Sequence, residues 1–281
     1  MNLKHNREKK KYSLKDLCEW INATLSLEMP QFKINELDSS LLASKKHYVL
    51  KTKGKSLDIV IKYFNREIVK WNAHWENEIT AYDILNMLNI YSGPKRIGVA
   101  RGIIIYQFIS GKTYQDLLLN QSLTNNAINQ LANWYASLHS FNLIFGDSRL
   151  INFIWGDNQE LQIIDSEDLQ KTKEREFQMQ DVAYLLCSFI DLSPGIFDNI
   201  VNSKHWEQMC SFLSMYCENS IKWDAKIKQF DRNSIEFLPF WNDIIYESLK
   251  KVIIRRKLSI STENMEFIKQ TIQEKLDFFF L

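Results

Sequence analysis

The strongest constraint on the fold is a change in hydrophobic patterning along the chain. Before about residue 110, short apolar runs of strand type alternate with turn residues, and one longer stretch has helical spacing. After about residue 180, nearly all of the chain shows the apolar spacing of amphipathic helices. The pattern predicts an α+β protein with two lobes, in which a small antiparallel sheet carrying one helix precedes a mainly helical lobe.

Individual elements follow from caps, turns and spacing. Ser13 is placed to cap a helix, and Gly54 lies between two β-rich runs that predict a hairpin. The other expected elements are a helix over 72–88, strands over 96–100 and 102–109, a helix over 125–141 and a second hairpin over 151–164.

Three regions follow from these elements. Residues 1–37 are expected to form an N-terminal helical appendage, 38–109 the β-rich lobe and 110–281 the helical lobe. The natural hinge between the lobes lies at 107–111. A cleft between two such lobes is a favoured place for a ligand.

Charge and composition limit the function. The 281 residues include 35 Lys+Arg and 34 Asp+Glu, and this near-balance argues against a dedicated nucleic-acid-binding protein. No apolar run approaches the ~20 residues that cross a bilayer, and the basic segment 4–11 is not followed by the apolar region of a secretory signal. We therefore expect a cytoplasmic protein without a membrane span. The four cysteines have no C-x-x-C spacing and are expected to be unreactive thiols.

Three side chains in the middle of the chain have the types and the order that phosphoryl transfer requires. Asp147 and Asn152 lie five residues apart on an expected loop, and Asp165 follows at the end of an apolar strand. One carboxylate must accept or orient the attacking hydroxyl, while an amide oxygen and a second carboxylate hold Mg²⁺ against the triphosphate. Each residue alone is an ordinary turn residue, but the ordered combination indicates this chemistry.

A lysine upstream fits the same chemistry. Lys62 stands inside an apolar strand, where an ammonium group is costly unless it is paired. Glu78 lies on the helix expected to pack against that sheet, and a Lys–Glu pair would hold the lysine toward the α- and β-phosphates. Two alternatives remain open: Lys62 faces solvent from an edge strand, or Glu76 takes the pairing role.

Several segments occur in an order that is itself informative. They are Lys62 with Glu78, the hinge-like Ile-Tyr-Gln-Phe-Ile-Ser-Gly111, the helix Leu-Ala-Asn-Trp-Tyr-Ala-Ser-Leu-His139, the segment from Gly146 to Asp165, and Gln-Asp181-Val-Ala-Tyr-Leu. Together, over about residues 38–190, they resemble the aminoglycoside phosphotransferase/choline kinase family of the protein-kinase-like fold.

The resemblance implies ATP-dependent phosphorylation of a small-molecule hydroxyl, with Mg²⁺ as the metal. The acceptor would be an aminoglycoside, a choline-like molecule or a sugar-like molecule. The implied roles are catalytic base for Asp147, magnesium ligands for Asn152 and Asp165, phosphate contact for Lys62, and adenine contacts for the backbone of Gln107 and Ile109.

The chain departs from that family in three places, one of which is the acidic run 165–168. Phe145 stands where the family usually has a histidine before Gly-Asp, so packing would replace a hydrogen bond there. The turn expected to cover the phosphates, within 38–47, contains no glycine. Backbone amides, or the hydroxyls of Ser39, Ser40 and Ser44, would then have to bind the phosphates.

Other features admit two interpretations. The run Asp165-Ser166-Glu167-Asp168 is either a solvated acidic turn or a site for a second metal or a cationic substrate. His139 is either a structural histidine or a base. Three tryptophans of the helical lobe, Trp206, Trp223 and Trp241, either pack between helices or form a cage for a quaternary ammonium group. The basic run 250–257 is either a solvated helix face or a surface that binds nucleic acid or an anionic head group.

The leading hypothesis is thus a small-molecule kinase. Its rival is a catalytically inactive kinase-like module that binds nucleotide, which the glycine-free turn and Phe145 motivate. A protein kinase acting on a partner is disfavoured, because only fifteen residues separate Asp165 from Asp181 and leave no room for a peptide-docking segment.

Overall fold

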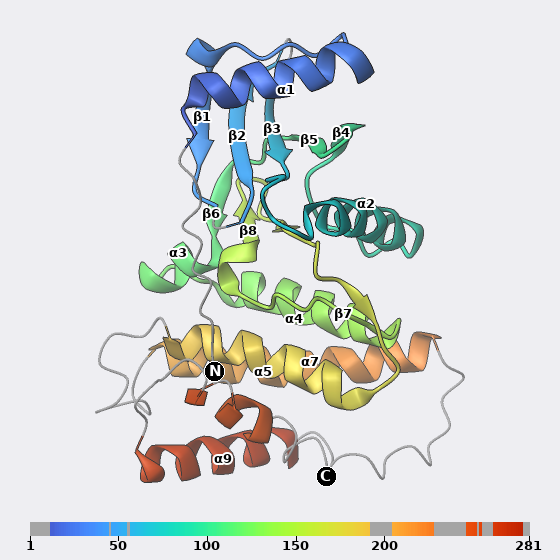
Figure 1. Ribbon diagram of the computed structural model, residues 1–281. Coiled ribbons are helices and arrows are strands. Elements are labelled where there is room, and N and C mark those ends of the chain that lie inside the picture. Colours follow the sequence, from blue (N-terminus) through green and yellow to red (C-terminus); the bar gives the residue numbers. More distant parts are fainter. Residues whose placement is uncertain are drawn as a thin grey trace, which may run out of the picture. The chain divides into compact units, whose positions relative to one another are not determined.

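The computed structural model describes residues 12–44, 46–54, 57–191, 204–227, 246–251, 253–254 and 261–277 (Figure 1). The chain forms two compact units. Unit 1 consists of Met1–Thr80 and Pro94–Ile109, and unit 2 of Ala81–Gly93 and Ser110–Leu281. Helices and antiparallel sheets occur together, so the expected α+β class is confirmed.

Unit 1 is built on one antiparallel sheet whose strands lie in the order β1-β2-β3-β5-β4. The strands are β1 (Ser39–Leu42), β2 (Tyr48–Lys53), β3 (Asp58–Tyr63), β4 (Arg96–Ala100) and β5 (Ile103–Gln107). The hairpin around Gly54 pairs Tyr48 with Tyr63 and Lys53 with Asp58. Because β3 lies between β2 and β5, it is an interior strand.

The helix α1 (Leu14–Glu28) packs on this sheet (Figure 1). Its buried side chains Leu17, Ile21 and Leu25 share one apolar core with residues of β2, β3 and β5. These residues recur every three or four positions, so a single helix face covers the strands. The short 3₁₀ helix η1 (Glu36–Asp38) then leads into β1.

The start of α1 allows a first prediction. The Ser13 hydroxyl accepts a hydrogen bond from the Asp16 N–H (3.1 Å), and the Asp16 carboxylate accepts from the Ser13 N–H (3.2 Å), which completes a capping box. Ser13→Ala should therefore destabilise the protein by about 1 kcal/mol in urea unfolding. Ser26→Ala, in the last turn of α1, is the matched control. An equal effect of both variants would show that the cap contributes nothing specific.

The same cap makes a pH-dependent contribution. Hydrogen bonds from Ser13 lower the pKa of the Asp16 carboxyl. The stabilisation is therefore present above the ordinary carboxyl range, and it is lost as the pH falls through the lowered pKa.

The boundary between the units falls within α2 (Trp71–Met87), between Thr80 and Ala81. Leu85 and Ile90, which follow the boundary, belong to the apolar core of unit 2. The indole N–H of Trp134 donates to the Ile90 carbonyl (3.1 Å), and the Ile163 N–H donates to the Ser92 carbonyl. Residues 81–93 are thereby tied into unit 2.

Unit 2 is mainly helical, with two small sheets. Its α7 lies against both α4 and α5, and α9 packs on α7 (Figure 1). The helices are α3 (Tyr114–Leu119), α4 (Asn125–Ser140), α5 (Arg175–Asp191), α7 (Lys204–Ile227) and α9 (Thr262–Asp277), with the 3₁₀ helix η2 (Leu150–Asn152). The strands are β6 (Gly111–Thr113), β7 (Leu143–Ile144), β8 (Phe153–Gly156), β9 (Leu161–Ile163) and β10 (Gln170–Lys171).

The second expected hairpin forms from β8 and β9, and β6 adds to it in the order β6-β8-β9. The strand β7 pairs with β10. In the described part of the chain, no helix is both long enough and apolar enough to cross a membrane. All four cysteines are free thiols, and burial raises the pKa of the Cys217 thiol, which keeps it in the unreactive form.

Candidate active site

Lys62 and Glu78 form a buried ion pair within unit 1. The Lys62 ammonium contacts the Glu78 carboxylate, and the two side chains are 10% and 4% exposed. The Tyr106 hydroxyl donates to the other oxygen of Glu78 (2.9 Å). The interpretation of Lys62 as a solvent-facing residue of an edge strand is therefore wrong, because β3 is interior and the ammonium is buried. A buried pair is stable only when its remaining atoms find partners, and Tyr106 supplies one.

The alternative partner, Glu76, lies on another face of α2. Its carboxylate accepts from the Asn72 side-chain amide (2.6 Å) at an exposed position. Residues two apart on a helix do not share a face, so only one of the two glutamates can point at the sheet. Glu78 is that residue.

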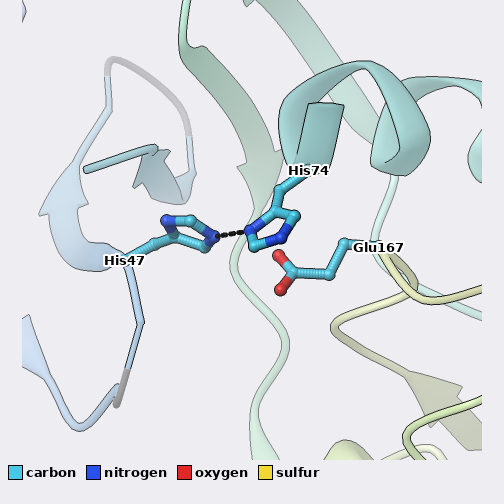
Figure 2. A group of neighbouring side chains, drawn as sticks. All are labelled: His47, His74 and Glu167. Atoms are coloured by element: carbon cyan, nitrogen blue, oxygen red, sulfur yellow. Dashed lines mark hydrogen bonds between the residues drawn. The ribbon is translucent and has the colours of Figure 1, made fainter. Parts of the chain in front are cut away.

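A pair of imidazoles lies beside the turn that precedes β2 (Figure 2). His47 is buried, and its Nδ1 accepts from the Asn65 backbone N–H (3.2 Å). A backbone N–H can only donate, so His47 must carry its own proton on Nε2. That Nε2–H then donates to Nδ1 of His74 on α2 (3.3 Å). The hydrogen bonds thus leave no lone pair on His47 Nε2 for a metal.

The turn expected to cover phosphates is shorter than the sequence indicates. Ser39 and Ser40 belong to the edge strand β1 and pair with Thr52 and Lys51 of β2. The Ser39 hydroxyl donates to the Asn35 carbonyl (2.6 Å), so it takes part in the end of η1 and not in a phosphate turn. Ser44 alone of the three serines lies in the β1–β2 connection, where it is half-buried.

Gln107 and Ile109 lie at the end of β5, where the chain leaves unit 1. Gln107 is the last residue of the strand, and its backbone N–H donates to the Lys95 carbonyl (2.9 Å). The next residue, Phe108, donates its N–H to the Asp58 carbonyl. The Gln107 N–H is therefore already used within the protein.

In unit 2, Asp147 and Asn152 are brought together. The Asn152 side-chain amide donates to the Asp147 carbonyl (2.8 Å) and to its carboxylate (3.1 Å). The loop begins at Gly146, whose φ of +82° favours glycine. A Cβ at this position would lie 2.4 Å from the Asp168 carbonyl oxygen, so the close approach also requires glycine.

Asp181 of α5 anchors this loop from inside the core. Its buried carboxylate accepts from the backbone N–H groups of Phe145 (2.7 Å) and Gly146 (3.0 Å), and from the Ser148 hydroxyl. His139 Nε2 lies 3.4 Å away. Charge-assisted hydrogen bonds from several donors hold a loop firmly. Sequence reasoning noted Asp181 as part of a motif but missed this role, which only the packing of α5 against the loop reveals.

His139 and Phe145 both have structural roles. His139 is buried at the end of α4, and its Nδ1 bonds to the Tyr216 hydroxyl (2.7 Å), which agrees with the structural interpretation. Phe145 is fully buried and packs its ring at 5.4 Å from Trp134 and 5.3 Å from Phe153. Aromatic packing is therefore the contribution of the Phe145 side chain to this loop.

Asp165 follows β9 in a left-handed conformation, with φ of +65°. The N–H of the preceding residue, Ile164, donates to the Asn152 carbonyl (2.9 Å), which ties this segment to the Asp147 loop. Non-glycine residues rarely adopt this conformation, and strained positions concentrate at functional sites. Of the acidic run, Ser166 and Glu167 are buried, so the solvated-turn interpretation is wrong for them.

Arg149, which sequence reasoning did not single out, pairs with Asp147. Its Nε donates to one carboxylate oxygen (2.5 Å) and its Nη2 to the other. This pairing, and then the charges of Asp147, Asp165 and Asp168, raise the pKa of the Arg149 guanidinium. Asp147 thus bonds to both Asn152 and Arg149, and the charge of Asp165 also acts on this arginine.

The remaining candidates have packing roles where the structure describes them. Trp206 packs near Phe267 with the rings tilted (5.5 Å between ring centroids), while Trp223 lies near Phe141 (6.2 Å) and donates to Asn133 (2.9 Å). Both tryptophans belong to α7, but Trp206 contacts α9 and Trp223 contacts α4. These separate contacts favour packing between helices over a shared aromatic cage. Trp241 and half of the basic run 250–257 lie outside the described residues. Lys250 is exposed and pairs with Glu247.

Unit 1 thus holds a buried Lys62–Glu78 pair. Unit 2 holds the hydrogen-bonded Asp147 and Asn152, and a further carboxylate at Asp165. Mg²⁺ prefers oxygen ligands of the kind that Asn152 and Asp165 carry. Comparison with known proteins adds no relative, because the chain matches no protein-family model and no curated protein.

Proposed function

We propose that the protein is a small-molecule kinase with a protein-kinase-like fold, which transfers the γ-phosphoryl group of MgATP to a hydroxyl of an aminoglycoside, choline-like or sugar-like acceptor. The order of elements supports the fold: a five-stranded antiparallel sheet with α2, followed by a mainly helical unit. The observation that carries the proposal is the Asp147 loop, in which a carboxylate and an amide are hydrogen-bonded and the backbone is fixed by buried Asp181.

In the proposed reaction, Asp147 accepts the proton of the acceptor hydroxyl as its oxygen attacks the γ-phosphorus and the bond to the β-phosphate oxygen breaks. Asn152 already donates its Nδ2 to Asp147, which leaves its Oδ1 for Mg²⁺. Asp165 is the second metal ligand. Lys62, held by Glu78, contacts the α- and β-phosphates, and the backbone of Ile109 contacts the adenine.

The test uses labelled ATP, Mg²⁺ and a panel of hydroxylated acceptors that includes aminoglycosides, choline and sugars. A labelled product, together with a Mg²⁺-dependent increase of the melting temperature by ATP, is the expected result, since a ligand of the native state raises its stability. Binding without transfer would favour the rival nucleotide-binding module. The pairing of Asp147 with Arg149 supports that rival, because it occupies the proposed base. Neither binding nor transfer would overturn both functions.

Lys62→Ala should weaken MgATP binding by at least about tenfold, because a partly desolvated ammonium–phosphate contact contributes more than 1.4 kcal/mol. Calorimetric titration with MgATP measures the effect. Lys53→Ala is the matched control, because Lys53 ends the neighbouring strand β2 at an exposed position. Equal MgATP affinities of the two variants would show that Lys62 does not contact the nucleotide.

A further inference from the structure

The Asp147 carboxylate is largely occupied in the structure. It accepts from Arg149 Nε (2.5 Å) and Nη2, and from Asn152 Nδ2 (3.1 Å). An ionised carboxylate has about four lone-pair sites, so three donors leave roughly one. A base that must accept a proton from a hydroxyl needs an accessible lone pair aimed at it. The arginine therefore occupies the atoms that the proposed reaction requires.

Arg149 can leave this position without moving the loop. Its neighbours Ser148 and Leu150 are buried, and Asp181 holds the loop through the backbone N–H groups of Phe145 and Gly146 and through the Ser148 hydroxyl. The Arg149 side chain, by contrast, is 32% exposed, and Asp147 is 20% exposed. Reorientation of the guanidinium is thus a side-chain movement on a fixed backbone.

A phosphate group competes directly with Asp147 for this guanidinium. Arginine forms two parallel hydrogen bonds with phosphate as readily as with carboxylate. The negative charges of Asp165 and Asp168 also act on Arg149. Mg²⁺ bound at Asp165 would cancel part of that negative charge, while a triphosphate would supply a new anionic partner. Such an exchange would replace one strong pair with another, and it would give Arg149 two discrete positions.

We propose that Arg149 is a switching residue, closed on Asp147 in the absence of nucleotide and transferred to the terminal phosphate when MgATP binds, so that the phosphoryl donor itself frees the base. This inference rests on the proposed function. It accounts for the presence of a bidentate arginine on a base that must be accessible during the reaction.

A double-mutant cycle of nucleotide affinity tests the switch. The ligand is Mg²⁺ with the non-hydrolysable ATP analogue AMP-PNP, titrated calorimetrically into the full chain and into Asp147→Asn, Arg149→Ala and the double variant. If Arg149 must leave Asp147 to bind phosphate, Asp147→Asn should tighten binding by at least about fivefold, and Arg149→Ala should weaken it by a similar factor. In the Arg149→Ala background, Asp147→Asn should change the affinity by less than about twofold.

Two controls make the cycle specific. MgADP lacks the terminal phosphate, so its affinity should be nearly insensitive to Arg149→Ala. Arg149→Lys, which keeps the charge but cannot donate from a planar fork, should also weaken AMP-PNP binding, and it replaces the alanine variant if that variant unfolds.

The outcomes separate the two claims. Independent effects of the two substitutions on AMP-PNP affinity would overturn the switch while leaving the proposed function in place. A wild-type chain that binds neither nucleotide would overturn the proposed function and the switch with it.

Discussion

Asp147→Asn is expected to slow phosphoryl transfer by about 10²–10⁴-fold, the usual contribution of a positioned general base. The substitution keeps the shape of the side chain but removes the basic lone pair. Asp147 is only partly buried, and the loop backbone is held by Asp181 and not by Asp147 itself. Folding and MgATP binding should therefore persist. Single-turnover transfer from labelled ATP to the acceptor identified in the panel measures the loss.

The matched control for Asp147→Asn is Asp157→Asn, an exposed carboxylate in the turn between β8 and β9 of the same unit. It changes the charge of unit 2 by the same amount and should leave the rate within a factor of about two. If both variants transfer phosphate at the wild-type rate, Asp147 is not the base.

Local sequence signals predicted the secondary structure well where a cap or a turn marks the boundary. The Ser13 cap and the Gly54 hairpin each depend on neighbouring residues. The edge strand β1 was missed, because Ser39–Leu42 is a run of four mostly exposed residues without strong β propensity. Its pairing with β2 is a tertiary contact that such a short run does not indicate.

The candidate site was predictable in residue type but not in its connections. The order of Lys62, Asp147, Asn152 and Asp165 indicated chemistry from the sequence alone. The pairing of Arg149 with Asp147 was not predictable. The two residues are two positions apart on a loop, and the loop's backbone conformation decides whether their side chains meet. That conformation is set by Asp181, more than thirty residues away. Long-range hydrogen bonds of this kind have no local sequence signature.

The stability of the loop leads to the second large effect. Asp181→Ala should destabilise unit 2 by about 3 kcal/mol, because it leaves the buried Phe145 N–H, the part-buried Gly146 N–H and the buried Ser148 hydroxyl without this acceptor. Urea unfolding followed by tryptophan fluorescence measures the loss. Trp134, which packs on Phe145, places a natural reporter next to the loop.

Asp147→Ala is the informative comparison for Asp181→Ala, since both remove a carboxylate from the same loop system. Asp147 accepts only side-chain donors, and its main partner Arg149 is a third exposed and can turn to water. Its loss should cost less than about 1 kcal/mol. Equal stability losses for the two variants would contradict the claim that Asp181 anchors the loop while Asp147 contributes little to its stability.

Asp181→Asn sharpens the same point. An asparagine keeps one acceptor oxygen, but its NH₂ group would face a donor in place of the second oxygen. The N–H groups of Phe145 and Gly146 donate to different oxygens of Asp181. Either orientation of the asparagine amide would therefore place its NH₂ group against one of these two backbone donors. The asparagine variant should therefore recover little of the stability lost in the alanine variant. Full recovery would mean that one of the two backbone hydrogen bonds is dispensable, and that the loop is held mainly by the packing of Phe145.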